Sequence, residues 1–155
     1  MPTLDKTIAR LNQVLATCHL GQGTFEYCAT KASTEELRSL FSDLAVKLSL
    51  IGDQLQRQIT RYGGRPVQHA SATDMLYCAR QRLKLLLERD DDRALLSEGL
   101  QLLNSVGEDI ETLVQEELPP LFRDPLVDQY NTLLQRQVHL RALLENAPDN
   151  PRSEH

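Results

Sequence analysis

Hydrophobic residues recur every three or four positions along most of the chain, which is the spacing of one face of an α-helix. The first such stripe predicts a helix over residues 3–32, and its steps of four and three are typical of helices packed at a shallow angle. One polar residue, Gln22, lies within this stripe between Gly21 and Gly23, which favour a kink or the close approach of a neighbouring helix. The stripe consists of Leu4, Ile8, Leu11, Leu15, Cys18, Gln22, Phe25 and Ala29.

A second helix is predicted to begin at Ser33 and to end before Gly63. The run from Ser33 to Glu36 matches a capping box, in which the serine hydroxyl accepts a bond from a free amide and the glutamate reaches back. Gly63 suits a left-handed cap, and Pro66 stops continuation. Because few residues separate the first two helices, we expect them to pack antiparallel. The second stripe consists of Leu37, Phe41, Leu44, Leu48, Ile51, Leu55, Gln58 and Tyr62.

The remaining chain predicts a crossover and two more long helices. Residues 67–92 read as a crossover with a short helix of its own, followed by a long helix over residues 93–118 that ends at Pro119. The last helix is predicted to begin at Asp124, with Pro125 in its first turn. The domain would then span residues 1–146, and residues 147–155 would form a flexible polar tail.

Four long helices with one long crossover predict an all-α fold, a four-helix bundle of the ferritin-like arrangement. The composition agrees, because Leu occurs 29 times against 11 for Val and Ile together, and Leu favours helices while β-branched residues favour strands.

Charge and cysteine usage narrow the class of protein. A net charge of −5 argues against nucleic-acid binding, which needs a basic surface. No apolar run is long enough to cross a membrane, and no secretory leader opens the sequence. Three cysteines without CxxC spacing indicate reduced thiols in a cytoplasmic protein. Several leucines off the main stripes favour a homodimer, or a cover supplied by the crossover; they are Leu20, Leu50, Leu85, Leu95, Leu102 and Leu143.

Several short motifs occur in an order that resembles a known family, between about Leu4 and Leu144. They are Leu11-Asn12 with Leu15, the stretch from Gly21 to Phe25, the stretch from Leu37 to Phe41, the stretch from Tyr62 to Pro66, Gly107-Glu108-Asp109, Leu118-Pro119-Pro120 and the stretch from Leu140 to Leu143. Together they resemble a family of small bacterial ferritin-like proteins catalogued as a domain of unknown function, distantly related to stress-induced ferritin-like proteins. The resemblance implies a ferritin-like fold and a connection with stress physiology, and it implies no activity.

The same resemblance sharpens the question of metal binding. The family tends to have Glu at the positions of Gln22 and Gln54, and often His at the position of Gln137, whereas Glu108 matches. A ferritin-like di-iron site needs a Glu from each of two helices and a Glu-x-x-His pair from each of the other two. No Glu-x-x-His occurs in this sequence. The polar residues within the apolar stripes are the neutral amides Gln22, Gln58 and Gln137, which are poor ligands for iron. We therefore expect no di-iron centre and no cofactor, with the three amides as polar members of the core.

Three functional hypotheses remain. The favoured one is a non-enzymatic bundle that acts as an interaction or structural protein, because the sequence contains no nucleophile elbow, phosphate loop or zinc-protease motif. The second is a diverged site for a single divalent ion, with His19, Glu26, Asp43 and Glu108 as ligands. The third is a bundle that binds a small apolar molecule between its helices.

Overall fold

The computed structural model describes residues 2–67 and 92–147, and these form four long helices. Helix α1 spans Pro2–Lys31, α2 spans Glu35–Arg61, α4 spans Asp92–Val114 and α5 spans Pro120–Asn146. The predicted crossover helix and nearly all of the predicted tail lie outside the described residues.

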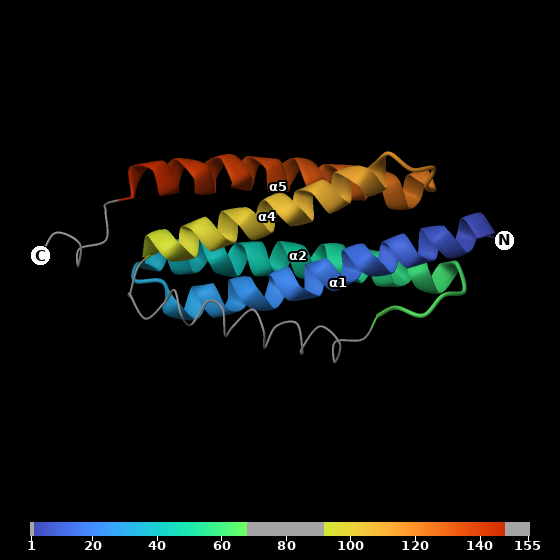
Figure 1. Cartoon of the computed structure of the whole chain (residues 1–155), viewed down its shortest axis with the longest axis horizontal. Coiled ribbons are helices and arrows are strands. Elements are labelled where there is room, and N and C mark those ends of the chain that lie inside the picture. The colour runs from blue at the N-terminus through green and yellow to red at the C-terminus, as the bar shows by residue number, and fades with distance from the viewer. Residues whose placement is uncertain (1, 68–91, 148–155) are drawn as a thin grey trace, which may run out of the picture.

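The four helices lie side by side as two antiparallel hairpins, α1 with α2 and α4 with α5 (Figure 1). Helix α1 also packs against α4, and α2 packs against α5, so the four helices surround one core. Helices α2 and α4 run in the same direction, which places the end of α2 and the start of α4 at opposite ends of the bundle (Figure 1). Two antiparallel hairpins packed around one core confirm the predicted fold class.

The core follows the predicted stripes. Large side chains from all four helices are fully or almost fully buried, and the set includes Leu11, Leu15, Phe25, Phe41, Leu44, Leu48, Leu55, Leu103, Ile110, Leu126, Leu133 and Leu140. Near the turn between α1 and α2, the rings of Phe25 and Phe41 stack with centroids 6.1 Å apart. Gly99 of α4 faces both rings, and an added Cβ would lie 3.1 Å from Phe41 and 3.3 Å from Phe25. A glycine at this position lets α4 approach the aromatic pair.

Gly21 confirms the predicted close approach near Gln22. A Cβ on Gly21 would lie 2.6 Å from Cδ1 of Leu48, so the missing side chain makes room for the leucine of α2.

At the far end of α2, Gly63 adopts a φ of 83°, the left-handed conformation expected of a helix cap. Asn12 of α1 then fixes the segment after α2, because its side chain donates to the Arg65 carbonyl and accepts from the Val67 amide.

Two predicted helix starts are wrong. The N-cap of α2 is Thr34, whose hydroxyl accepts a bond of 3.2 Å from the Leu37 amide, and Ser33 instead donates through its amide and hydroxyl to the Asp92 carboxylate. Helix α5 begins at Pro120 and not at Asp124, so Pro125 lies inside the helix. The Pro119 carbonyl accepts from the amides of Phe122 and Arg123, which forms a first turn before the proline. Helix α4 ends at Val114, before the predicted Leu118.

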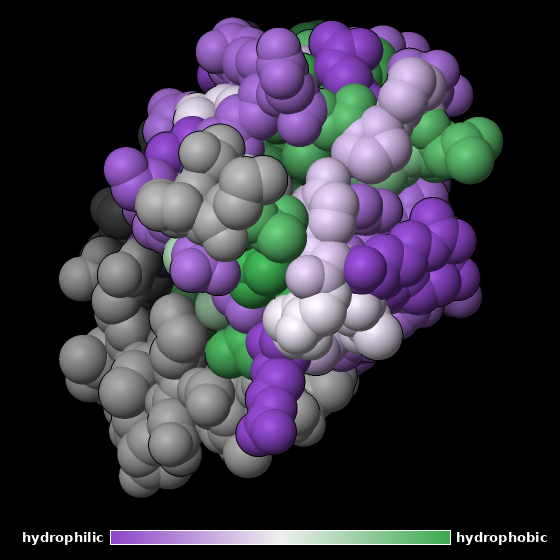
Figure 2. All heavy atoms as spheres, turned by 90° about the vertical axis from the view of Figure 1, so that its right-hand side faces the viewer, coloured by the Kyte–Doolittle hydropathy of each residue, from purple (hydrophilic) through white to green (hydrophobic). Residues whose placement is uncertain are grey.

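The surface at one end of the bundle mixes hydrophobic and hydrophilic residues. This end contains the start of α1, the end of α2 and the turn between α4 and α5, and Figure 2 shows green areas interspersed with purple ones there. None of the described helices is long and apolar enough to span a membrane.

Candidate functional site

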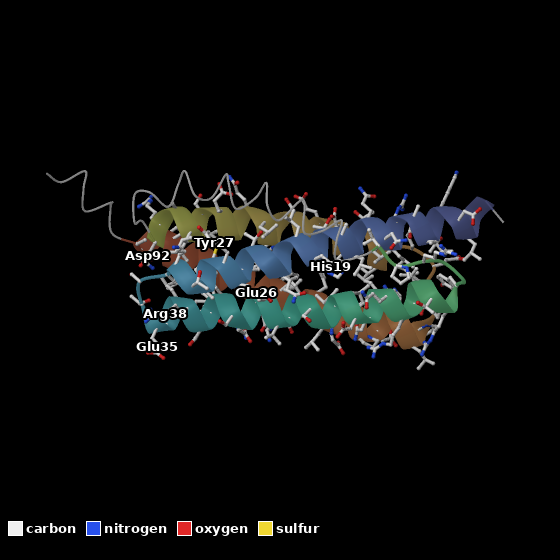
Figure 3. All side chains as sticks on the ribbon, turned by 90° about the horizontal axis from the view of Figure 1, so that it is seen from below. His19, Glu26, Tyr27, Glu35, Arg38 and Asp92 are labelled. Atoms are coloured by element: carbon white, nitrogen blue, oxygen red, sulfur yellow. The ribbon has the colours of Figure 1, made fainter. Side chains whose placement is uncertain are left out.

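The four residues of the hypothetical ion site lie on three helices. His19 and Glu26 both belong to α1, where His19 is buried and Glu26 is exposed (Figure 3). Asp43 lies half-buried on α2, and Glu108 is exposed on α4. Within residues 2–67 and 92–147, no three His, Cys, Asp or Glu side chains gather into a group that could hold a metal ion. The structure therefore does not bring these four residues together.

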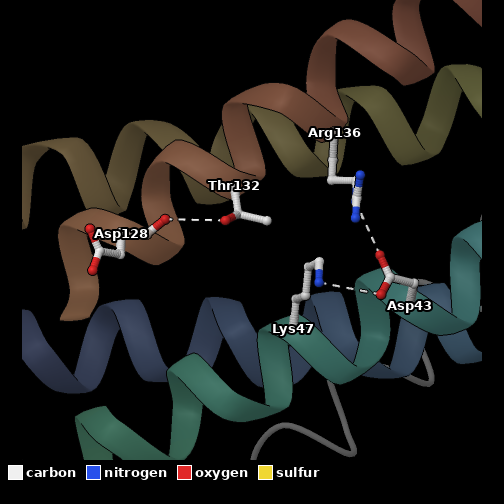
Figure 4. Close-up of polar contacts among 5 residues, drawn as sticks. All are labelled: Asp43, Lys47, Asp128, Thr132 and Arg136. Carbon is white, nitrogen blue, oxygen red and sulfur yellow. Dashed lines mark hydrogen bonds and ion pairs between the residues drawn. The ribbon is translucent and has the colours of Figure 1, made fainter.

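Asp43 has a different set of neighbours from the one proposed for it. Its carboxylate accepts from Nε of Arg136 on α5 at 3.1 Å and lies 3.3 Å from Nζ of Lys47, one turn further along α2 (Figure 4). Two cations thus neutralise this carboxylate, and the contact ties α2 to α5. This pairing could not be predicted from the sequence, because Arg136 is 93 residues away and both groups lie on the polar edges of their helices.

Only one of the three amides expected in the core is fully buried. Gln58 is 4% exposed, whereas Gln22 and Gln137 are half-buried at the edges of the bundle. Gln22 donates to the carboxylate of Glu26 at 3.2 Å, one turn along the same helix. These two are less buried than predicted because a stripe position at the edge of the core can direct its amide to a neighbouring polar group outside the hydrocarbon interior.

Gln137 shows what the amide does at such an edge. Its Nε2 donates to the Leu103 carbonyl of α4 at 3.2 Å and lies 2.9 Å from the position that a Cβ on Gly107 would take. Gly107 therefore accommodates the glutamine, so this glycine serves close packing between α4 and α5. Glu108 and Glu111 beside it are exposed, as expected for charges on the flank of a helix.

Two further amides have buried oxygens: Gln54, at a position where the resemblance implies Glu, and Gln129, which the sequence did not single out. Oε1 of Gln54 on α2 and Oε1 of Gln129 on α5 are shielded from solvent and have no hydrogen-bond partner within the described part of the chain. Their helices are neighbours, and this pair of helices is the least closely packed of the four neighbouring pairs.

The surroundings of two buried thiols and of one tyrosine hydroxyl disfavour their ionisation. Burial raises the pKa of Cys18 to about 12, with a smaller contribution from Asp109, and burial with Glu98 nearby does the same for Cys28. Burial also raises the pKa of Tyr130, whose hydroxyl is bonded to the Glu111 carboxylate. Neither thiol is a thiolate near neutral pH, so neither is prepared to bind a metal or attack a substrate.

Two shallow grooves run along the outward face of α2. One, of about 330 Å³, lies between α1 and α2 and is lined by Gln22, Glu26, Ser42, Ala45, Val46, Ser49 and Leu50. The other, of about 520 Å³, lies nearer the start of α2 and is lined by Glu35, Arg38, Ser39, Ser42, Asp43 and Val46. Both grooves are lined by Ser42 and Val46, so they lie next to each other on the surface of α2.

Residues 6–115 match the model of a family described as a domain of unknown function, DUF2383. The chain belongs to this family. A search of curated proteins gives no significant match.

Solved structures confirm the ferritin-like fold of this DUF2383 protein. A mutant of Dps1 from Mycobacterium smegmatis superposes with a TM-score of 0.71 at 18% identity, covering 91% of this chain and 96% of its own. A two-domain protein from Anabaena variabilis, with DJ-1/ThiJ/PfpI-like and ferritin-like domains, superposes with a TM-score of 0.69 at 18% identity. That match covers 96% of this chain and 39% of the Anabaena protein. Identities this low establish the fold and leave the activity open.

Ferritin-like folds can hold two metal ions in the bundle core, but the described residues do not fit such a group. The polar side chains buried there are His19, Thr24 and Gln58, among a core of hydrocarbon. Of these three, only His19 supplies an imidazole and none supplies a carboxylate, whereas a di-iron site requires several of both. Of the carboxylates considered as ligands, Glu26 is exposed and Asp43 pairs with Lys47 and Arg136.

Proposed function

We propose that this protein is a non-enzymatic helical bundle that acts by binding another protein and has no di-iron centre. The observation that carries the proposal is the filling of the core: hydrocarbon side chains occupy most of the space between the helices, and the buried described residues include one imidazole, His19, and no carboxylate. The outward side of the bundle, by contrast, presents large apolar side chains to solvent, as expected of a surface with a partner.

The resemblance to relatives of stress-induced ferritin-like proteins supports a role in bacterial stress physiology, inside the cytoplasm. The reduced, buried thiols Cys18 and Cys28 are compatible with that compartment. On this proposal the ferritin-like bundle serves as a scaffold for an interaction surface.

The alternative of a single divalent ion held by His19, Glu26, Asp43 and Glu108 receives less support. The described parts of these helices bring no three potential ligands together, and Asp43 is already neutralised by Lys47 and Arg136. Binding an ion there would require the helices to repack and this pair of contacts to break.

Element analysis of the purified full chain tests the proposal. Protein from cells grown with added iron and manganese is dialysed and measured by mass spectrometry, and we expect well under one metal ion per chain. Thermal melts with added Fe²⁺, Mn²⁺ or Zn²⁺ should show no rise in Tm, because an ion that bound the folded state alone would stabilise it in proportion to its excess. Stoichiometric metal that survives dialysis, or a Tm that climbs with ion concentration, would overturn the proposal.

A further inference from the structure

Helix α2 carries two large apolar side chains on the side that faces away from the core. Val46 is 58% exposed and Leu50 is 51% exposed, and they lie one helical turn apart near the middle of the helix. Single exposed apolar residues are common, but a pair on one face of one helix forms a small patch that water solvates poorly.

Small side chains surround this pair. Ser39, Ser42, Ala45 and Ser49 lie beside it, and the two grooves of about 330 and 520 Å³ run along these positions. The outward face of α2 therefore combines two protruding side chains with a hollow next to them. Such a face can pack against a copy of itself, because the protruding pair of one copy can contact that of the other while the small side chains beside both pairs allow the helices to approach.

The charges at the two ends of α2 have the matching symmetry. The exposed residues at its start include Glu35 and Glu36, and those at its end include Arg57 and Arg61. Figure 3 shows Glu35 at the start of the helix, directed away from α1. Val46 and Leu50 stand on either side of Leu48, and Glu35 and Arg61 stand at equal distances on either side of it. Asp53 is matched across Leu48 by Asp43, whose carboxylate contacts Lys47 and Arg136, and Arg38 has no charged counterpart.

We infer that the outward face of α2 binds the same face of a second copy of this chain, with the two α2 helices antiparallel about a two-fold axis near Leu48. In that arrangement Val46 of each copy meets Leu50 of the other, and Glu35 of each copy meets Arg61 of the other. A parallel arrangement would instead place Glu35 against Glu35 and Arg61 against Arg61. The inference rests on the proposed function and names its partner and its surface.

Sedimentation velocity of the full chain over a range of concentrations tests the inference. We expect a dimer in the micromolar range, and we expect Val46→Glu to raise the dimer Kd by at least about tenfold, because it buries two carboxylates against leucine. The matched control is Val138→Glu on α5, which changes a side chain that is 66% exposed and should leave the dimer intact. The inference would be overturned by a chain that stays monomeric at concentrations on the order of 100 micromolar, or by a dimer whose Kd Val46→Glu does not change.

Charge reversal gives a second test that folding defects cannot imitate. Glu35→Arg alone and Arg61→Glu alone should each raise the dimer Kd about two- to fivefold, the range expected for exposed ion pairs. The double variant re-forms both pairs with reversed sign and should bring the Kd back towards that of the unchanged protein. Both substitutions oppose the helix dipole, so the double variant should have the lowest Tm even as its dimer recovers. Additive weakening in the double variant would contradict the antiparallel arrangement.

The outcomes separate this inference from the proposed function. A metal-free monomer overturns the α2 interface and leaves the non-metal bundle standing. A dimer that carries stoichiometric metal supports the α2 interface, provided that Val46→Glu disrupts it, and overturns the proposed function.

Discussion

At the scale of single residues, Cys18 and Cys28 show how burial controls chemistry in this core. Both thiols were expected on or near the apolar stripes, and both are buried there, while Cys78 lies outside the described residues. Removal from water disfavours the charged thiolate, which is why the pKa of each rises from 9.0 to about 12. The folded state thus binds these two protons more tightly than the unfolded chain does.

This difference predicts a loss of stability in alkali. Below pH 9 the thiols are protonated in both states and their contribution is complete; above pH 9 the unfolded thiols ionise first, and the contribution is lost as the pH rises towards 12. The expected slope is about 1.4 kcal/mol per pH unit for each thiol. Urea unfolding at pH 7.5 and 10.5 measures it. A Cys18→Ala, Cys28→Ala variant should lose less stability between these two pH values, and an equal loss in both proteins would contradict the prediction.

At the scale of helices, the sequence predicted which segments are helical but not where α2 and α5 begin. Periodicity is a property of the segment itself, so the stripes of α1 and α2 could be found directly. The start of α2 depends on a distant group: Asp92 accepts from Ser33 across 59 positions, which leaves Thr34 as the cap. Likewise Pro125 suggested a helix start, although the turn closed by the Pro119 carbonyl already precedes it.

The contact between Ser33 and Asp92 should couple the turn between α1 and α2 to the start of α4. Asp92 accepts from the Ser33 amide at 3.0 Å and also from its hydroxyl, and its charge suits the first turn of a helix. We expect Ser33→Ala and Asp92→Asn each to reduce the free energy of unfolding by about 1 kcal/mol. The double variant should lose less than the two single losses combined, because the bond can be removed only once.

Urea unfolding of the four proteins measures this coupling. Thr34→Ala serves as the comparison: it removes a cap within α2 itself, should cost about 1 kcal/mol, and should add fully to Asp92→Asn. Full additivity of Ser33→Ala with Asp92→Asn would show that the two residues act independently.

At the scale of the molecule, the residues that line the space between the helices determine how much of the candidate site could be predicted from the sequence. The absence of Glu-x-x-His is readable in the sequence, so the poor fit to a di-iron group could be argued from residues alone. The places of Gln22 and Gln137 could not, because a helical stripe does not say whether an edge position faces the core, a neighbouring carbonyl or solvent. Gln137 donates to the Leu103 carbonyl only because Gly107 leaves room for it. Of the outward pair, Leu50 could be predicted from the sequence because it lies off the main stripes, whereas Val46 was not predicted.

The four helices also differ in how closely they pack against the rest of the bundle. Helix α2 buries eleven residues, whereas α5 buries four, and the contact between these two helices is less close than that between α1 and α2. The polar link between α2 and α5, from Asp43 to Arg136, joins partly exposed side chains and is worth at most about 1 kcal/mol. Local opening costs least where little apolar surface is lost from the core. Helix α5 is therefore the element that should open first.

Hydrogen exchange tests this expectation on the full chain. Amides in the second half of α5, around Leu140, should exchange at least about tenfold faster than those around Leu48 of α2, through openings that leave the other three helices folded. The Val46→Glu variant removes any protection that a partner copy gives to α2 and should preserve the order. Arg136→Ala should accelerate exchange in α5 further and leave the amides around Leu48 nearly unchanged. Equal protection of α2 and α5, in both variants, would mean that the bundle opens only as a whole and that the weak contact between α2 and α5 does not define a separate unit.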